Sequence, residues 1–417
     1  MSKTLRRWLG ATVAAAVAAA VALVVLTVAS PAASADTPDF YTPPSPLPAG
    51  NPGDVIRSAP ITYSSQSGVT GARIMYLSKD SKNQPVAVTG TVLVPSAPWT
   101  GGGPRPIVAY DPFTAGMGTQ CIVSKTLAGD VSSDLVGSVQ TSFINPLLQK
   151  GFAVAETDYP RSPSNGDEEY VVRAAEAQGT LDAIRAAQRL PGSGLSAGGP
   201  VAIEGYSQGG GAAAAAVELA PSYAPDLKLV GAYAGAPPAD LKVVAQSLDG
   251  GTYVAFEAMA VLGTNAAYPE LNITGLLNQQ GVTAMRQLDQ DCTLNAVFGF
   301  AFQHTSSYTT TGKSVSDYLS QEPYASMIAA QTIGNLKPTA PVEVESAPND
   351  DVVPNSQVVT MAKSWCSKGA TVQYNNIFEL LPTFTHALAA FTATGDATNW
   401  LSDRFAGKST SGNCGQF

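Results

Sequence analysis

Residues 205–209, which read Gly-Tyr-Ser-Gln-Gly, constrain the fold of this chain more than any other feature. An apolar run precedes them and a run of small residues follows, so they join an expected strand at 201–203 to an expected helix ending near Ala220. G-x-S-x-G between a strand and a helix is typical of a nucleophile elbow, a sharp turn that lifts a serine hydroxyl out of a sheet. The glycines permit the turn, because a Cβ at either position would collide with neighbouring backbone. We therefore expect Ser207 to be a nucleophile.

The chain on both sides of this turn alternates between short apolar runs and helical patterns. The expected strands of this part are 106–110, 151–156, 201–203 and 227–233, and the longest helical pattern is 168–190. Such alternation predicts a parallel sheet with right-handed crossovers, that is, an α/β fold. Two earlier runs, 72–77 and 86–94, predict an antiparallel meander at the start of the sheet. The last strands are expected at 342–345 and 372–378, each followed by a helix.

The domain organisation follows from where this alternation stops. Residues 36–60 are rich in Pro, Gly and Ser and predict an irregular arm. Residues 241–333 are helical in pattern, with no clear strand before Pro341, and predict an inserted helical cap or lid. The core would then consist of two parts, 61–240 and 334–417, forming a mostly parallel sheet flanked by helices.

The first 35 residues have the features of a secretory signal peptide. Three basic residues near the start precede an uncharged stretch from 8 to 28, and Ala-Ser-Ala at 33–35 is a small-x-small cleavage pattern. We expect cleavage after Ala35 and an extracellular protein. An uncleaved signal anchor remains the alternative, because the apolar stretch is long. No later apolar run is free of charges and prolines, so we expect no membrane span after cleavage.

Composition excludes several classes of function. With 23 Lys and Arg against 32 Asp and Glu, the chain is acidic and has no basic stripe for nucleic acid. Charged residues make up only 13 %, which suits a protein that meets apolar material. The four cysteines, all beyond the signal, favour two disulfides, and the sequence allows three pairings. With two histidines and no C-x-x-C spacing, we expect neither a metal nor another cofactor.

A serine nucleophile needs a base beside it and an acid to orient that base. In folds with this elbow the order along the chain is serine, acid, histidine. The two histidines are His304 and His386. His304 lies in the expected cap and precedes the best acid candidate, so we expect His386 to be the base.

The acid should follow the expected strand at 341–345. Asp350 begins a D-x-x-V-P pattern there and is the expected acid. Its neighbour Asp351 is the alternative, which we interpret as a surface carboxylate of an Asp-rich turn. Asp350 would hold the imidazole in one tautomer and stabilise the imidazolium.

An oxyanion hole requires two backbone N–H donors near the attacked carbonyl. One should be Gln208, which follows the serine. The other should come from the loop after the strand that ends at Tyr110, where we expect Asp111. The alternative is that Asp111 only caps a turn, because no His-Gly-Gly-Gly run occurs there.

Four stretches together resemble the secretory lipase family. They are Ala109-Tyr110-Asp111 followed by Cys121, the elbow at 205–209, Gly-Ala-Pro-Pro-Ala-Asp-Leu at 235–241, and the Asp350 loop. The resemblance covers essentially the whole chain after the signal, and the stretch at 235–241 is its most specific part. It implies an α/β-hydrolase core, a helical lid inserted after the elbow region, and hydrolysis of carboxylic esters.

The same resemblance implies details of the site. It implies that Asp111 contributes to the oxyanion hole, and that the disulfides are Cys121–Cys292 and Cys366–Cys414. The chain departs from the family at Gln208 and where Ile122-Val123 follows Cys121. Neither departure removes a catalytic group, but the acyl pocket can differ from that of the family.

The sequence therefore predicts an exported serine ester hydrolase, a triacylglycerol lipase, whose partner is an ester or lipid substrate at a lipid–water interface. A short-chain or polymer esterase on the same triad is the first alternative. A serine peptidase is a second enzymatic alternative, since it shares acyl-transfer chemistry. From a different class, the chain could be a non-catalytic binding module of the cell envelope. Hydrolysis rates over acyl chain length would separate the lipase from the short-chain or polymer esterase, and labelling by a fluorophosphonate would separate an enzyme from the binding module.

Overall fold

The computed structural model describes residues 39–130, 135–163, 166–379 and 383–417. The chain divides into two units, residues 1–44 and residues 45–417. In the first unit the rings of Phe40 and Tyr41 meet edge to face, with 5.5 Å between their centroids. The predicted signal peptide, residues 1–35, and its cleavage after Ala35 lie outside the described residues.

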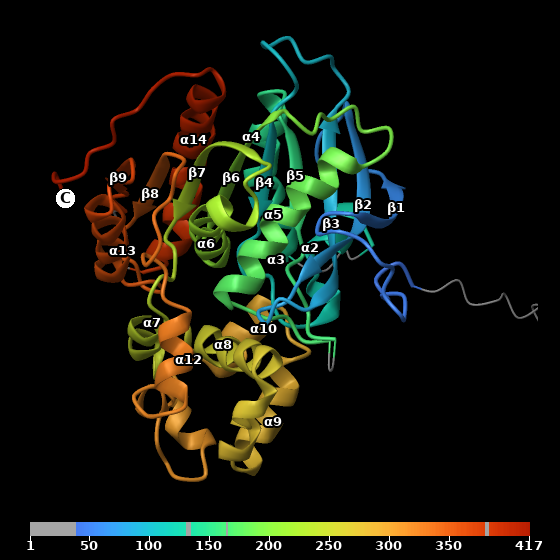
Figure 1. Ribbon diagram of the computed structural model, residues 1–417. Coiled ribbons are helices and arrows are strands. Elements are labelled where there is room, and N and C mark those ends of the chain that lie inside the picture. Colours follow the sequence, from blue (N-terminus) through green and yellow to red (C-terminus); the bar gives the residue numbers. More distant parts are fainter. Residues whose placement is uncertain (1–38, 131–134, 164–165, 380–382) are drawn as a thin grey trace, which may run out of the picture. The chain divides into compact units, whose positions relative to one another are not determined.

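The centre of this unit is a nine-stranded sheet with the order β1-β2-β3-β5-β4-β6-β7-β8-β9. The strands are β1 Val55–Ile61, β2 Val69–Lys79, β3 Pro85–Pro95, β4 Ile107–Asp111, β5 Ala153–Thr157, β6 Pro200–Tyr206, β7 Lys228–Gly235, β8 Val342–Ser346 and β9 Val372–Asn376. The pairs β1–β2, β2–β3 and β3–β5 are antiparallel. The remaining five pairs, from β5–β4 to β8–β9, are parallel. This is the mostly parallel α/β sheet that the alternation of strands and helices predicts, with the meander at one edge (Figure 1).

Two local predictions were wrong at their boundaries. The arm expected at 36–60 is not irregular throughout, because Val55–Ile61 forms β1. β1 is an edge strand, and an edge tolerates a residue without an N–H such as Pro60. The helix expected from 168 begins only at Arg173, because Val171 adopts a φ of 52° and its N–H donates to the Glu176 carboxylate.

Helices cover both faces of the sheet, and the alternation of side chains along each strand divides the core between them. Ile107 and Ala109 of β4 pack in one cluster, whereas Val108 and Tyr110 pack in the other. The first cluster includes residues of α5 Arg173–Arg189, α6 Gln208–Tyr223 and α13 Asn355–Ser367. The second includes residues of α2 Val123–Ala128, α4 Thr141–Gln149 and α14 Thr385–Phe405. Burial on both faces explains why the central strands are predominantly apolar.

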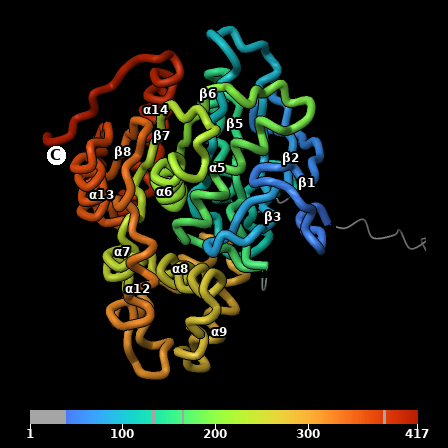
Figure 2. The backbone as a smooth tube through the Cα atoms, in the orientation of Figure 1, coloured from blue at the N-terminus to red at the C-terminus, as the bar shows by residue number. Residues whose placement is uncertain are grey.

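Helices without strands fill the segment between β7 and β8, apart from the chain that leads into β8. We call residues 241–330 the cap. Its elements are α7 Leu241–Leu248, α8 Val254–Ala267, η2 Pro269–Leu271, η3 Ile273–Leu276, α9 Gln279–Leu288, α10 Thr293–Phe300, η4 Thr305–Tyr308, α11 Val315–Tyr318 and α12 Tyr324–Ala330. Met259, Leu262, Leu288 and Phe300 are buried in one apolar cluster, which also includes Met117 and Tyr170 from outside the cap. In the tube view these helices form a group beside the sheet (Figure 2). Among the described helices none is both long and apolar enough for a bilayer crossing.

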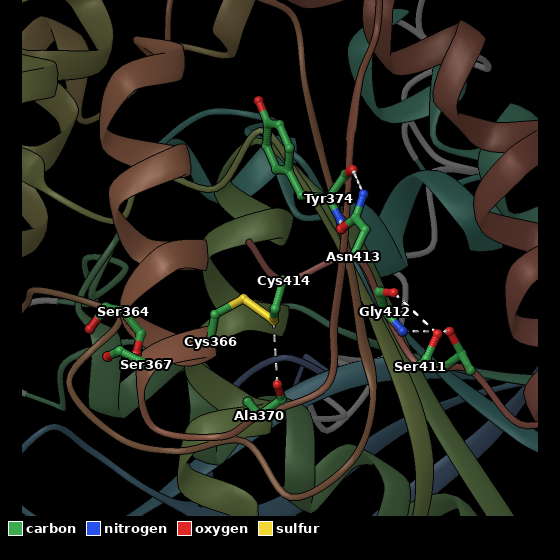
Figure 3. Close-up of a disulfide and its surroundings, with 10 residues drawn as sticks. Ser364, Cys366, Ser367, Ala370, Tyr374, Ser411, Gly412, Asn413 and Cys414 are labelled. Atoms are coloured by element: carbon green, nitrogen blue, oxygen red, sulfur yellow. Dashed lines mark hydrogen bonds between the residues drawn. A yellow bond between two sulfur atoms is a disulfide. The ribbon is translucent and has the colours of Figure 1, made fainter. Parts of the chain in front are cut away.

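Two disulfides tie distant segments together, in the pairing that the family resemblance implies. Cys121, in the short helix η1 Thr119–Cys121, is bonded to Cys292 at the start of α10, and so links the core to the cap. Cys366 of α13 is bonded to Cys414 near the C-terminus (Figure 3). Beside it, Asn413 hydrogen-bonds the backbone N–H and carbonyl of Tyr374 at 2.8 and 2.7 Å. The C-terminal segment thus covers β9, the last strand of the sheet, whose outer edge would otherwise be open.

Candidate active site

Ser207 lies at the turn between β6 and α6, as the elbow motif predicts. β6 ends at Tyr206 and α6 begins at Gln208, with Ser207 between them at φ 59° and ψ −122°. A non-glycine residue rarely adopts this conformation, which costs of the order of 1–3 kcal/mol and is concentrated at functional sites. The Ser207 N–H donates to the carbonyl of Gly235 at 2.9 Å. That bond holds the strained residue against the end of β7.

The two glycines of the motif are required by close backbone contacts. A Cβ at Gly205 would lie 2.1 Å from the carbonyl oxygen of Gly209, and a Cβ at Gly209 would lie 1.9 Å from that of Asp111. Any side chain at either position would overlap backbone atoms that cannot move aside. The contact at Gly209 also brings the end of β4 directly against the elbow.

The structure brings the three predicted catalytic side chains together in one hydrogen-bonded chain. The Oγ of Ser207 lies 2.8 Å from Nε2 of His386. The Nδ1 of His386 lies 2.8 Å from Oδ2 and 3.0 Å from Oδ1 of Asp350. Because a carboxylate only accepts, Nδ1 carries the proton and Nε2 is free to accept the Ser207 hydroxyl proton. This is the tautomer in which an imidazole can act as a base towards serine.

Asp350 is held by backbone donors as well as by the imidazole. Its Oδ1 accepts from the N–H groups of Val352 and Val353 at 2.9 and 2.7 Å. The Asp350 side chain is fully buried, and that of His386 is 11 % exposed. Fixed donors around a buried carboxylate stabilise its negative charge and fix its orientation.

The neighbouring Asp351 does not match the prediction of a surface carboxylate. It is half-buried and caps the start of α14. Its Oδ2 accepts from the Phe384 N–H at 2.7 Å, and its Oδ1 accepts from the His386 N–H at 3.0 Å. A carboxylate at a helix N-terminus satisfies N–H groups that have no partner within the helix. Asp351 therefore orients the backbone of His386, whereas Asp350 orients its ring.

The second histidine lies elsewhere. His304 is in the cap with its side chain 65 % exposed, and its Nδ1 lies 3.6 Å from Asp249. His386, in contrast, is buried and packs against Tyr206, with 5.1 Å between ring centroids. The Tyr206 hydroxyl also donates to the His386 carbonyl at 2.9 Å.

Gln208 and Asp111, the two residues predicted for the oxyanion hole, both lie against the elbow. Gln208 is the first residue of α6, so its N–H has no acceptor within the helix. Asp111 is the last residue of β4, and its backbone contacts Gly209. Its buried side chain accepts from the Thr180 hydroxyl at 2.7 Å, so it caps no turn. Burial raises the pKa of Asp111 well above its usual value, against the opposing effect of the Thr180 bond.

Two buried glutamates that the sequence analysis missed hold the Gln208 side chain. Its Nε2 donates to Glu168 at 2.6 Å and to Glu176 at 2.9 Å. Burial raises the pKa of Glu168 to about 7, with Arg161, 3.6 Å away, acting in the opposite direction. Burial also raises the pKa of Glu176 well above its usual value. Glu168 precedes α5 and Glu176 lies in its first turn, in a stretch with several other charged residues, so no sequence signal singled them out.

An apolar pocket leads from Ser207 into the cap. It contains about 1030 Å³ of space not filled by protein atoms, part of it open to solvent. Its walls come from α7, α8, α11 and α12 together with Val352 and Val353, whose N–H groups hold Asp350. A predominantly apolar cleft with a few polar groups at one end is the usual form of a small-molecule site. Among the described residues no three His, Cys, Asp or Glu side chains are placed to hold a metal ion.

The sheet, the elbow and the pocket define the class of protein. It is an α/β-hydrolase of the lipase and esterase class. Residues 130–413 match the family model described as secretory lipase, and the chain belongs to that family.

Relatives and solved structures agree with this. A probable inactive lipase of Mycobacterium tuberculosis is 30 % identical over 389 residues, which are 91 % of this chain and 84 % of that one. Lipase A of Moesziomyces aphidis is 27 % identical over 381 residues, covering 85 % and 80 % of the two chains. The structure of Candida antarctica lipase A in its closed state superposes with a TM-score of 0.81 at 25 % identity, covering 91 % and 88 %. A rice cell wall degrading esterase from Xanthomonas oryzae shares the fold, with a TM-score of 0.69 at 19 % identity, covering 85 % of this chain and all of that one.

Proposed function

We propose that the protein is a serine hydrolase that cleaves carboxylic esters of long-chain acids, a triacylglycerol lipase, with Ser207, His386 and Asp350 as its catalytic triad. The observation that carries the proposal is the hydrogen-bonded chain from Ser207 to Asp350, with 2.8 Å at both links and with Ser207 in the wall of an apolar pocket. Ser207 is partly exposed, so an ester can reach its hydroxyl.

The proposed reaction has two halves. The Ser207 oxygen forms a bond to the ester carbonyl carbon while its proton moves to Nε2 of His386. The carbon–oxygen bond to the alcohol then breaks, and the alcohol leaves with that proton. Water attacks the acyl-enzyme by the same route, with its proton passing through Nε2 back to the Ser207 oxygen as the acid leaves. Throughout, Asp350 stabilises the imidazolium that forms in each half.

The negative charge on the carbonyl oxygen needs donors that are fixed before the reaction. The proposed donors are the backbone N–H groups of Gln208 and Asp111. Gln208 is at the N-terminus of α6, where the helix dipole also favours negative charge. Its side chain is held by Glu168 and Glu176, which keeps the backbone of this residue in place.

The pocket favours long acyl chains over short ones. Each methylene buried in an apolar wall contributes about 0.8 kcal/mol to binding. We expect kcat/KM on p-nitrophenyl esters to rise with chain length from acetate to at least octanoate. A steep fall beyond about four to six acyl carbons would instead support the short-chain or polymer esterase.

One relative bears the name probable inactive lipase, so a non-catalytic binding module is the alternative to be tested. The purified protein is incubated with a fluorophosphonate probe, which reacts only with an activated serine. We expect stoichiometric labelling of Ser207, located by mass spectrometry, and no labelling of Ser207→Ala. We expect that variant to lose roughly 10⁴ to 10⁶-fold of the esterase rate. If the wild-type protein is not labelled, and if it binds a p-nitrophenyl ester without hydrolysing it, the protein is a binding module.

The proposed location is extracellular, after export and cleavage following Ala35. Expression in a secreting host, followed by N-terminal sequencing of the protein in the medium, tests it. The expected mature N-terminus is Asp36. A protein that keeps residues 1–35 and stays with the membrane fraction would identify a signal anchor instead.

A further inference from the structure

One polar side chain that lines the apolar pocket, Glu257, has no role in the triad. Glu257 is on α8, and the pocket is lined by Glu257 and by Ala260, Val261 and Thr264 of the same helix. These positions lie one turn apart, on one face of α8. Met259 and Leu262, which do not line the pocket, are buried in an apolar cluster. Glu257 therefore lines the space where the acyl chain would lie.

The carboxyl group of Glu257 is buried without a partner. The residue is 3 % exposed, and neither of its carboxyl oxygens has a hydrogen-bond partner among the described residues. Burial raises the pKa of Glu257 to about 9, and the charge of Asp249 adds to this, so the group is protonated at neutral pH. A buried polar group without a partner costs about 1–3 kcal/mol of stability and calls for an explanation.

The other polar side chains of the pocket differ from Glu257 in this respect. Each of them makes a hydrogen bond within the described part of the chain. Thr264, on the same face of α8, donates to the Ala260 carbonyl at 2.7 Å. Glu257 is thus the one polar side chain of the pocket wall that has no hydrogen-bond partner within the described part of the chain.

We propose that Glu257 is a specificity-determining residue, which selects acyl chains that carry a hydroxyl group. A protonated carboxyl has one donor, its O–H, and acceptor capacity on its other oxygen. A hydroxyl group is both acceptor and donor, so one hydroxyl on the chain satisfies both oxygens of Glu257. A keto group would satisfy only the donor, and a plain hydrocarbon would leave both unpaired. This inference rests on the proposed ester hydrolysis at Ser207, because the acyl chain must be attached there.

The test compares kcat/KM for p-nitrophenyl dodecanoate with that for hydroxydodecanoate esters, whose hydroxyl is placed at successive carbons from mid-chain to the end. For the wild-type protein we expect a preference of about tenfold for the hydroxylated ester at one position, the ratio that one hydrogen bond supplies. Neighbouring positions should show no gain, because the group is fixed on a helix.

Two substitutions then assign the preference to this residue. Glu257→Leu keeps a similar volume and removes both polar atoms, so it should abolish the preference and raise the rate on plain dodecanoate. Glu257→Gln keeps one donor and one acceptor and should retain the preference within about threefold. The matched control is Thr264→Val, which removes a partnered hydroxyl from the same helix face and should leave the ratio at its wild-type value.

The outcomes separate the two proposals. No gain at any hydroxyl position, or an equal gain in Glu257→Leu, overturns the role of Glu257 while leaving ester hydrolysis intact. If no ester is hydrolysed and Ser207 is not labelled by the fluorophosphonate, the proposed function itself has failed. If Glu257→Leu does not fold, two measurements still test the role of Glu257. They are the ratio of kcat/KM for hydroxylated and plain esters in Glu257→Gln, and its dependence on hydroxyl position in the wild-type protein.

Discussion

Asp350 in the core and Glu257 in the cap are both buried carboxyl groups close to the same pocket, yet their surroundings differ. Asp350 follows β8 and accepts hydrogen bonds from two backbone N–H groups and from His386. Glu257 is on α8, and neither of its oxygens has a partner among the described residues. Donors around Asp350 suit it to stabilise a positive charge on the imidazole. Burial keeps Glu257 neutral, and its carboxyl group stays without a partner until a ligand supplies one.

The comparison shows how one pocket combines two kinds of surface. The end of the sheet supplies rigid polar geometry, because parallel strands end together and the loops between them meet there. The cap supplies apolar volume from short helices. Substitutions in the two regions test this division.

Replacing Asp350, the carboxylate that has hydrogen-bond partners, should have the largest effect, which is on kcat. Asp350→Asn keeps the shape but turns one oxygen into a donor, which favours the wrong tautomer of His386. We expect kcat to fall about 10⁴-fold, with KM little changed. Steady-state kinetics on a p-nitrophenyl ester provide the measurement. If Asp350→Asn loses less than tenfold, the carboxylate does not act through His386.

Loss of the Cys121–Cys292 disulfide, which links the core to the cap, should have the second largest effect, which is on the free energy of unfolding. Replacing Cys121 and Cys292 by serine should lower the free energy of unfolding by about 2–5 kcal/mol. The matched control is the same change at Cys366 and Cys414. The sequence separations are 171 and 48 residues, so loop entropy predicts a loss about 1 kcal/mol larger for the first pair. Urea denaturation of both variants measures it, and a larger loss from the second pair would contradict the prediction.

Removing the unpartnered carboxyl should stabilise the protein. Near pH 4.5, Glu257→Leu is expected to raise the free energy of unfolding by about 1–3 kcal/mol. The pKa of Glu257 is raised from 4.5 to about 9, so between these values the folded state holds a proton that the unfolded chain has lost. Wild-type stability therefore falls as pH rises through this window, by at most about 1.4 kcal/mol per unit from this group.

The advantage of Glu257→Leu should accordingly grow from pH 5 to pH 9, as thermal melting at several pH values would show. The control is Thr264→Val, on the same face of α8, whose effect should not vary with pH. A pH-independent difference between Glu257→Leu and the wild-type protein would mean that Glu257 is hydrated or ionised in the folded state.

The helix cap at His386 should have the smallest effect. Asp351→Ala removes the acceptor for two N–H groups of α14 and should lower stability by about 1 kcal/mol. Because one of those groups belongs to His386, kcat should also fall several-fold. Asp317→Ala provides the comparison, since Asp317 belongs to the capping box of α11 and lies outside the pocket wall. If Asp351→Ala and Asp317→Ala lose equal stability and hydrolyse the ester at equal rates, Asp351 acts only as a helix cap.

Patterns along the chain were sufficient to predict the class of fold and to select the residues of the candidate triad. Strands and helices have different spacings of apolar residues, and these spacings are visible locally. The elbow is a contiguous stretch of the sequence. Scarcity of histidine left few choices for the base, and the order of the residues favoured His386.

Contacts between distant segments determined what those patterns missed. β1 forms only because β2 pairs with it. The late start of α5 depends on Glu176, whose carboxylate also accepts from the Gln208 side chain. Asp351 meets the start of α14 some 35 residues later in the chain. None of these contacts leaves a periodic signal.

Glu257 shows the same limit most clearly. In sequence it is one acidic residue in a helical pattern, and solvent would be the ordinary place for it. Burial depends on which face of α8 is turned inward, and the lack of a partner depends on every side chain around it. Local periodicity follows from backbone geometry, whereas the environment of a side chain follows from packing of the whole fold, and the chemistry of the pocket depends on that packing.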